Sequence, residues 1–137
     1  MQGTRRRSEL RGAFNIFLMK RTLIIGASEK PERYSNKAIR KLRAHGHEVI
    51  ALASRPGRVE DVIFETEKKD FPDIDTVSLY VGPQNQNDFT DYVIGLKPRR
   101  VIFNPGTENA GFENKLQQAG IQTEQACTLV LLGTGQY

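Results

Sequence analysis

The residues best suited to chemistry in this sequence come directly after its first apolar strand. Thr22–Ile25 predicts a buried strand, the turn Gly26-Ala27-Ser28 follows it, and Arg33 and Ser35 stand where a helix is predicted to begin. Glycine lets the backbone approach an anion closely, and a helix start presents unpaired N–H groups. Hydroxyl and guanidinium groups add hydrogen bonds to phosphate oxygens. The pattern favours a phosphate site, although an ordinary turn with Ser35 as helix N-cap would look similar.

The first loop departs from the dinucleotide-binding fingerprint, because Ser28 and Pro31 stand where that motif has glycines. An NAD site also requires an acidic residue after the second strand, to hold the ribose hydroxyls. This chain has Ala53, Ser54 and Arg55 there instead. A cation at that point suits a ribose that carries an extra phosphate, as in NADP and coenzyme A; the alternative is a solvated surface arginine.

Two further loops have the composition of ligand-contacting turns. The third contains Val81, Gly82 and Pro83, small residues that can form a wall against an adenine or a pantetheine arm. The fourth, Asn-Pro-Gly-Thr at residues 104–107, is compact enough for backbone contacts through Gly106. Helix-start chemistry and turn chemistry are the structural alternatives for these two loops.

The sequence predicts no catalytic residue and no metal ligand. It contains no paired carboxylates, no metal-ligand spacing and no Ser/His/Asp arrangement. His45 and His47 flank Gly46 at the end of the first predicted helix, away from the predicted loops, and are interpreted as structural. Cys127 is interpreted as a small buried residue rather than a reactive thiol.

Strands and helices alternate along the chain, which is typical of an α/β fold with a parallel sheet. Strands are predicted at 22–25, 48–52, 76–80, 100–103 and 121–124, and helices at 35–44, 84–96 and 109–119; Val62–Phe64 is a candidate minor strand. These elements predict a Rossmann-like, three-layer open parallel sheet of five strands, with helices on both faces. The expected strand order, numbered along the chain, is 3-2-1-4-5. The four loops then meet at the carboxyl ends of the strands.

The composition indicates one domain at residues 19–137 after an N-terminal extension at 1–18. The extension holds four arginines and one glutamate, so it accounts for three of the four net positive charges of the 137-residue chain. We expect it to be disordered or to precede the natural start; a transit peptide or a nucleic-acid-binding arm is the alternative. The near-neutral remainder predicts no nucleic-acid partner, and no apolar run approaches the roughly 18 residues of a membrane span. A single cysteine fits a reducing cytoplasm.

Taken together, the loops resemble the coenzyme A-binding domain family, small Rossmann-like proteins similar to the N-terminal domain of the succinyl-CoA synthetase α subunit. The resemblance covers about residues 20 to 127. The matching residues are Gly26, Ala27, Ser28, Pro31, Arg33, Ser35, Pro56, Val81, Pro83, Gly106, Ala119, Gly120, Ile121 and Cys127. The chain departs from the family where Val-Asn-Pro often follows the second strand, where Trp-x-Gln-x-Gly often follows the fourth, and where Asp-Arg-Cys usually stands near the end.

The resemblance implies that the first loop holds the coenzyme's phosphates, the second its adenosine end, and that the third lines the groove. Contact roles then fall on Gly26, Ala27, Ser28, Arg33, Ser35, Arg55, Val81, Gly82 and Pro83, and Gly106 joins them from the fourth loop. We expect a non-catalytic coenzyme A or acyl-CoA binding protein that works with a protein partner or as a homodimer. A small NADP-dependent oxidoreductase and a ligand-free protein-interaction domain on the same fold are the two alternatives.

Overall fold

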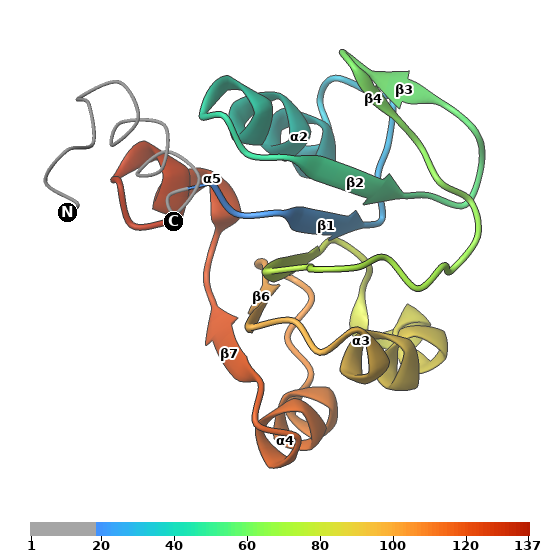
Figure 1. The fold of residues 1–137 in the computed structure, drawn as a ribbon, viewed down its shortest axis with the longest axis vertical. Coiled ribbons are helices and arrows are strands. Elements are labelled where there is room, and N and C mark those ends of the chain that lie inside the picture. The colour runs from blue at the N-terminus through green and yellow to red at the C-terminus, as the bar shows by residue number, and fades with distance from the viewer. Residues whose placement is uncertain (1–18) are drawn as a thin grey trace, which may run out of the picture.

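The computed structural model describes residues 19–137, and the predicted N-terminal extension at 1–18 lies outside the described residues. The centre of the fold is a sheet of five parallel strands (Figure 1). The strands are β1 (Thr22–Ile25), β2 (Val49–Leu52), β5 (Thr76–Leu79), β6 (Arg100–Phe103) and β7 (Gln122–Gln125). All residues of β1, β5 and β6 are buried, because each of these strands has a neighbour on both sides and helices over both faces.

The Rossmann-like parallel sheet is confirmed, but the predicted strand order 3-2-1-4-5 is wrong. The observed order is β2-β1-β5-β6-β7, so the third long strand, β5, inserts between β1 and β6. Thr22 pairs with Thr76 and Ile25 with Leu79 in register. This order buries β5 along its whole length at the centre of the sheet and leaves the first residues of β2 half-exposed at an edge.

The crossover from β2 to β5 contains a β-hairpin in place of a helix. Its strands are β3 (Arg58–Val59) and β4 (Val62–Ile63), which confirms the minor strand predicted at 62–64. The chain then runs beside β2, where the Glu65 N–H donates to Ala51 at 2.8 Å and the Ala53 N–H donates to Glu65 at 2.9 Å. This backbone pairing covers part of the β2 edge and brings the hairpin to the carboxyl end of the sheet.

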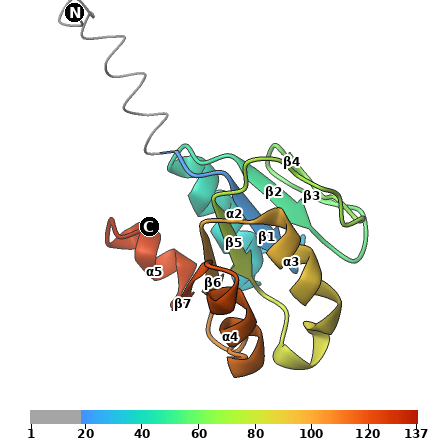
Figure 2. The same ribbon diagram turned by 60° about the horizontal axis from the view of Figure 1, so that its bottom comes forward.

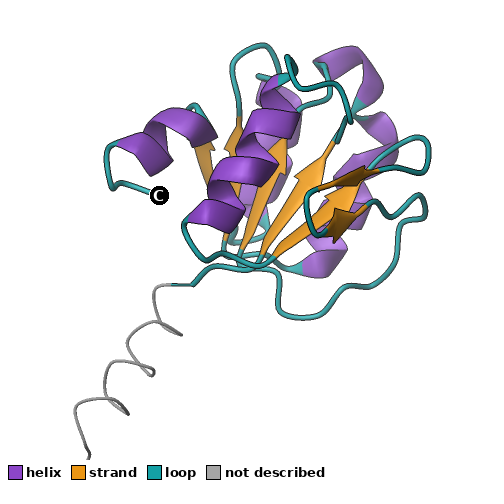
Figure 3. Cartoon of the chain, turned by 90° about the horizontal axis from the view of Figure 1, so that it is seen from above, coloured by secondary structure: helices purple, strands orange, loops and turns teal. Residues whose placement is uncertain are grey.

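Helices cover both faces of the sheet, as predicted (Figure 3). On one face, α2 (Tyr34–Ala44) and α5 (Thr128–Gly133) pack Ile39, Leu42 and Leu132 into a core with Ile24. On the other, α3 (Thr90–Leu96) and α4 (Ala110–Gln118) contribute to a second core. The α5 helix follows β7 and lies near the C-terminus (Figure 2). The sequence pattern did not predict this helix.

The helix predicted at 84–96 is interrupted. Two short 3-10 turns, η2 (Pro83–Asn85) and η3 (Asn87–Phe89), precede α3. The side chain of Gln86, between these turns, is fully buried and donates to the carbonyl oxygens of Val81 at 3.0 Å and Thr107 at 2.7 Å. These two bonds tie the third loop to the fourth. None of the helices between residues 19 and 137 has the length and apolar character needed to cross a membrane.

Candidate ligand-binding site

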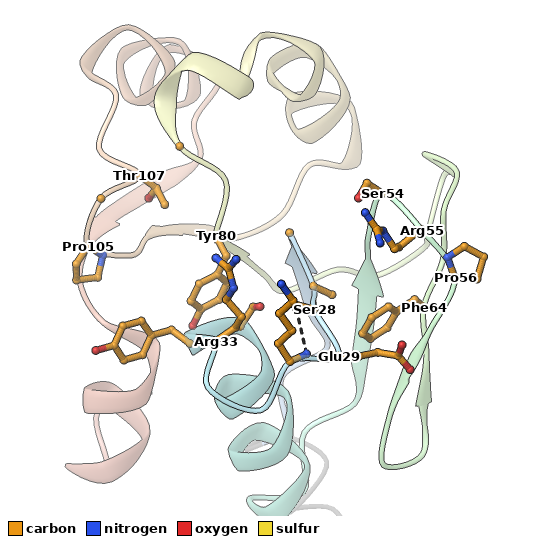
Figure 4. Close-up of a pocket in the computed structure, with 17 residues that line it drawn as sticks. Ser28, Glu29, Arg33, Ser54, Arg55, Pro56, Phe64, Tyr80, Pro105 and Thr107 are labelled. Atoms are coloured by element: carbon orange, nitrogen blue, oxygen red, sulfur yellow. Dashed lines mark hydrogen bonds between the residues drawn. The ribbon is translucent and has the colours of Figure 1, made fainter.

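A cavity of about 600 Å³ opens at the carboxyl ends of the strands (Figure 4). This volume lies within the usual range of small-molecule sites. The loops after β1, β2, β5 and β6 enclose it together with the start of α2. The lining residues are Gly26, Ala27, Ser28, Glu29, Lys30, Arg33, Tyr34, Ser35, Ser54, Arg55, Pro56, Phe64, Tyr80, Gly82, Pro105, Gly106 and Thr107.

The structure brings eight of the ten predicted site residues to the cavity wall, namely Gly26, Ala27, Ser28, Arg33, Ser35, Arg55, Gly82 and Gly106. The other two, Val81 and Pro83, lie outside the lining. The Val81 side chain packs on the core beneath the first loop, and Pro83 begins η2. Tyr80 and Gly82 therefore form the wall that the third loop contributes.

Gly26 shapes the first loop through its backbone conformation. Its φ of +97° lies in the left-handed region, which favours glycine. The N–H groups of Gly26 and Ala27 both donate to the carbonyl oxygen of Leu52, at 3.0 and 3.1 Å. These two groups are thus occupied by the protein, and any anion at this loop must bind donors further along it.

Such donors are present where the loop enters α2. The N-cap is Arg33, with extended φ and ψ and no side-chain cap, and Ser35 lies buried inside the first turn. Ser35 is therefore not the N-cap that its residue type suggested. Among the described residues, the N–H groups of Tyr34, Ser35 and Asn36 have no partner, so the positive end of the helix borders the cavity.

The charged side chains at the cavity favour an anionic ligand. Lys30, Arg33 and Arg55 supply three cations, and Figure 4 shows Arg33 and Arg55 on opposite sides of the first loop. The carboxylate of Glu29 is turned toward the hairpin, where it accepts the Arg58 N–H at 2.8 Å. The cations at the cavity therefore outnumber the carboxylate. They flank the first loop, which leads to the free N–H groups at the start of α2.

Nine lining residues were not among the predicted site residues: Glu29, Lys30, Tyr34, Ser54, Pro56, Phe64, Tyr80, Pro105 and Thr107. Phe64 reaches the cavity because the chain after β4 runs back along β2, a long-range arrangement with no local signal. Tyr34 is 67% exposed at the cavity rim, with the ammonium of Lys37 5.3 Å from its ring centroid. The composition of the first loop indicated a phosphate site without showing which of its side chains face inward.

A buried polar cluster supports the floor of the site. The Asn104 amide donates to the Ser78 hydroxyl and the Leu79 carbonyl, each at 2.8 Å, and its oxygen accepts the Thr128 N–H at 2.9 Å. One asparagine thus ties the fourth loop to β5 and to the start of α5. Beside this cluster, burial raises the pKa of Tyr80 to about 12, so the phenol is neutral at physiological pH.

The histidines and the cysteine lie outside the cavity lining. His47 is buried next to the amino end of β1, where its Nδ1 accepts the Lys20 N–H at 2.9 Å, and His45 is exposed. Cys127 is half-buried at the start of α5. Within residues 19–137, no group of three or more histidine, cysteine or carboxylate side chains is arranged to hold a metal ion.

Comparison with known proteins identifies relatives of this architecture. The family model described as "CoA binding domain" matches residues 20–133. An uncharacterised protein of known crystal structure is 44% identical, with a TM-score of 0.85 over 87% of this chain and 98% of that one. A hypothetical protein from Pyrococcus horikoshii OT3 is 25% identical, with a TM-score of 0.75 over 93% and 89% of the two chains. A Thermus thermophilus protein at 21% identity shares the fold, with a TM-score of 0.77 over 97% and 100%. The comparison with curated proteins found no match.

Proposed function

Because this chain belongs to the CoA-binding domain family, we propose that it binds coenzyme A or an acyl-CoA in the cavity described above and performs no chemistry on it. The observation that carries the proposal is that the cation-lined cavity lies wholly within the matched residues 20–133. Among the described residues, Glu29 supplies the carboxylate of the cavity lining, and it accepts a backbone N–H of the hairpin, which favours a structural role for it over proton transfer.

The first loop and the start of α2 are the proposed site of the coenzyme's diphosphate. The unpartnered N–H groups at the start of α2 and the guanidinium of Arg33 offer donors and positive potential on the same side of the cavity. The hydroxyl of Ser28 accepts the Lys30 N–H at 3.1 Å, which leaves its own proton available for a phosphate oxygen. Backbone and side-chain donors thus converge on one anion.

Arg55 is the proposed contact for the phosphate on the ribose of the adenosine end. It lies beyond β2 beside Ser54 and Pro56, with the ring of Phe64 nearby in the cavity wall (Figure 4). The pantetheine arm then extends in the opposite direction, past Tyr80, Gly82 and Gly106. A module of this kind would hold the coenzyme for a protein partner, or for a second copy of itself, in the cytoplasm.

Calorimetric titration of the full chain with coenzyme A, acetyl-CoA, 3′-dephospho-CoA, NADP and NAD tests the proposal. We expect saturable binding of coenzyme A and acetyl-CoA, weaker binding of 3′-dephospho-CoA, and no binding of NAD. Binding of NADP alone would contradict the proposal and favour an oxidoreductase. Absence of binding by all five would contradict it in favour of a protein-interaction domain. Incubation with acetyl-CoA followed by mass spectrometry of the nucleotide checks that it is returned unchanged.

A further inference from the structure

The side chain of Asn36 connects α2 to the first loop. Asn36 is the third residue of α2 and is fully buried. Its amide nitrogen donates to the main-chain oxygen of Ser28 at 2.9 Å, and its oxygen accepts from Nε of Arg40 at 2.7 Å. Helical side chains point toward the helix N-terminus, so a residue at this position reaches the loop that precedes the helix.

The two partners of Asn36 fix the orientation of its amide. A guanidinium can only donate, so the Asn36 atom that faces Arg40 must be the oxygen. A carbonyl can only accept, so the atom that faces Ser28 must be the nitrogen. Arg40 is itself directed by Glu60 in the turn of the hairpin, 3.5 Å away. The direction of the Ser28 carbonyl is therefore set by buried and partly buried contacts on the far side of the loop from the cavity.

The planar trans peptide transmits this constraint to the next residue. In such a peptide the C=O and N–H groups point in opposite directions. Since the Ser28 carbonyl is held against buried Asn36, the N–H of Glu29 is directed to the other side of the loop. Both residues line the cavity. In contrast to the N–H groups of Gly26, Ala27 and Lys30, that of Glu29 has no partner within residues 19–137.

We propose that Asn36 is a positioning residue that holds the Glu29 N–H toward the cavity as a hydrogen-bond donor for a phosphate group. The identity of that phosphate as part of coenzyme A rests on the function proposed above, whereas the donor geometry does not. The Asn36 side chain contacts no ligand in this scheme. Its contribution is to exclude the alternative orientation of the Ser28–Glu29 peptide, which would present a carbonyl oxygen to the anion.

The direct test is ¹⁵N–¹H NMR of the Glu29 amide in the full chain during titration with inorganic pyrophosphate. In the wild type we expect a saturable downfield shift of this amide proton. In Asn36→Ala we expect the shift to be lost and the affinity for pyrophosphate to fall about tenfold, the usual effect of a hydrogen bond to a charged group. An unmoved Glu29 amide in the wild type, or an unchanged response in a folded Asn36→Ala, would overturn the proposal.

Asn109→Ala is the matched control. Asn109 also uses both ends of its amide, donating to Gln86 at 2.9 Å and accepting the Phe112 N–H at 3.2 Å, but neither partner belongs to the first loop. This variant should lose stability while its Glu29 amide still responds to pyrophosphate. If Asn36→Ala does not fold, Asn36→Asp keeps the acceptor for Arg40 and lacks the donor for Ser28, and the same loss of response is expected.

A parallel titration with coenzyme A separates this inference from the proposed function. If pyrophosphate moves the Glu29 amide and coenzyme A does not bind, the function proposed above fails and the positioning role of Asn36 stands. If coenzyme A binds to the wild type and to Asn36→Ala equally well, and the Glu29 amide is unaffected in both, the function stands and the positioning role fails.

Discussion

Gly26, the first residue after β1, lies directly against the main chain of Tyr80, the first residue after β5. A Cβ atom placed on Gly26 would stand 3.1 Å from the Tyr80 carbonyl carbon and 3.1 Å from Cγ1 of Val81. This contact exists because β1 and β5 are neighbours and their carboxyl ends leave the sheet at the same level. The glycine turn is therefore required by the packing of two strands as well as by its positive φ.

Gly26→Ala should be considerably more destabilising than Gly106→Ala. Both residues have φ above +90°, but a Cβ on Gly106 would have no atom within 4 Å. Gly106→Ala is expected to cost about 1–2 kcal/mol of unfolding free energy from its backbone conformation alone. Gly26→Ala adds an overpacking cost of about 1–3 kcal/mol. Urea unfolding of the two variants measures the difference; equal losses would show that the main chain of Tyr80 can move away.

Arg55→Ala should weaken coenzyme A binding by about 1–3 kcal/mol, the usual value of a hydrogen bond to a charged partner. The loss should be much smaller for 3′-dephospho-CoA, because the proposed partner of Arg55 is the phosphate that this analogue lacks. Arg58→Ala is the control: Arg58 is an exposed hairpin arginine whose backbone N–H, rather than its side chain, contacts Glu29. Calorimetry provides both affinities, and equal losses for the two ligands would remove Arg55 from the phosphate contact.

Two buried tyrosine hydroxyls should respond in opposite ways to replacement by phenylalanine. The Tyr137 hydroxyl lies 2.5 Å from Oγ1 of Thr22, so Tyr137→Phe is expected to cost about 1 kcal/mol. The Tyr80 hydroxyl is buried near the hydroxyls of Ser78 and Thr128 but has no hydrogen-bond partner of normal geometry among residues 19–137. Tyr80→Phe removes an unsatisfied polar atom and should leave stability unchanged or raised by up to about 1 kcal/mol. Thermal unfolding of both variants is the measurement, and a destabilised Tyr80→Phe would indicate a bound water or another partner for this group.

Stability should fall on mild acidification because of His47. Burial lowers the pKa of His47 below its ordinary value of 6.5; the charges of Lys20, His45 and Arg100 act in the same direction, and that of Asp75 opposes them. The unfolded chain therefore binds the proton first, so the unfolding free energy is highest above about pH 6.5 and decreases as pH drops toward the folded-state pKa.

Urea unfolding between about pH 5 and 7.5 measures this slope, in the range where histidine titrates. His47→Gln should flatten it. His45→Gln should retain it, because His45 is exposed and lacks the buried contact with Lys20. A slope that persists in His47→Gln would assign the pH dependence to another group.

Local sequence patterns predicted most of the elements. The apolar runs at 22–25, 76–79 and 100–103 are strands, and the helix predicted at 35–44 is α2. Gly26 and Gly106 marked turns with positive φ. Such features depend on residues close together in the chain, so periodicity and glycine placement are sufficient to find them.

The strand order required the tertiary structure. The predicted order and the observed order are both compatible with right-handed crossovers, and the choice between them depends on which strand has a neighbour on both sides. The runs of β2 and β5 are similarly short, and β5 even contains two hydroxyl residues, Thr76 and Ser78. In the folded protein, the Ser78 hydroxyl forms hydrogen bonds with Asn104 and Thr128 in the interior. These bonds allow β5 to lie at the centre of the sheet despite its hydroxyl side chains.

For the candidate site, residue types alone indicate which loops carry the small, hydroxyl and cationic residues, and that these loops follow strands of a parallel sheet. The side chains that face the cavity follow only from the folded structure. There, Val81 packs on the core, Phe64 after β4 lines the cavity, and the Gly26 N–H donates to the Leu52 carbonyl. The reason is physical. Loop composition is set by local backbone requirements, whereas the direction of each side chain and N–H group is set by contacts between residues far apart in the chain.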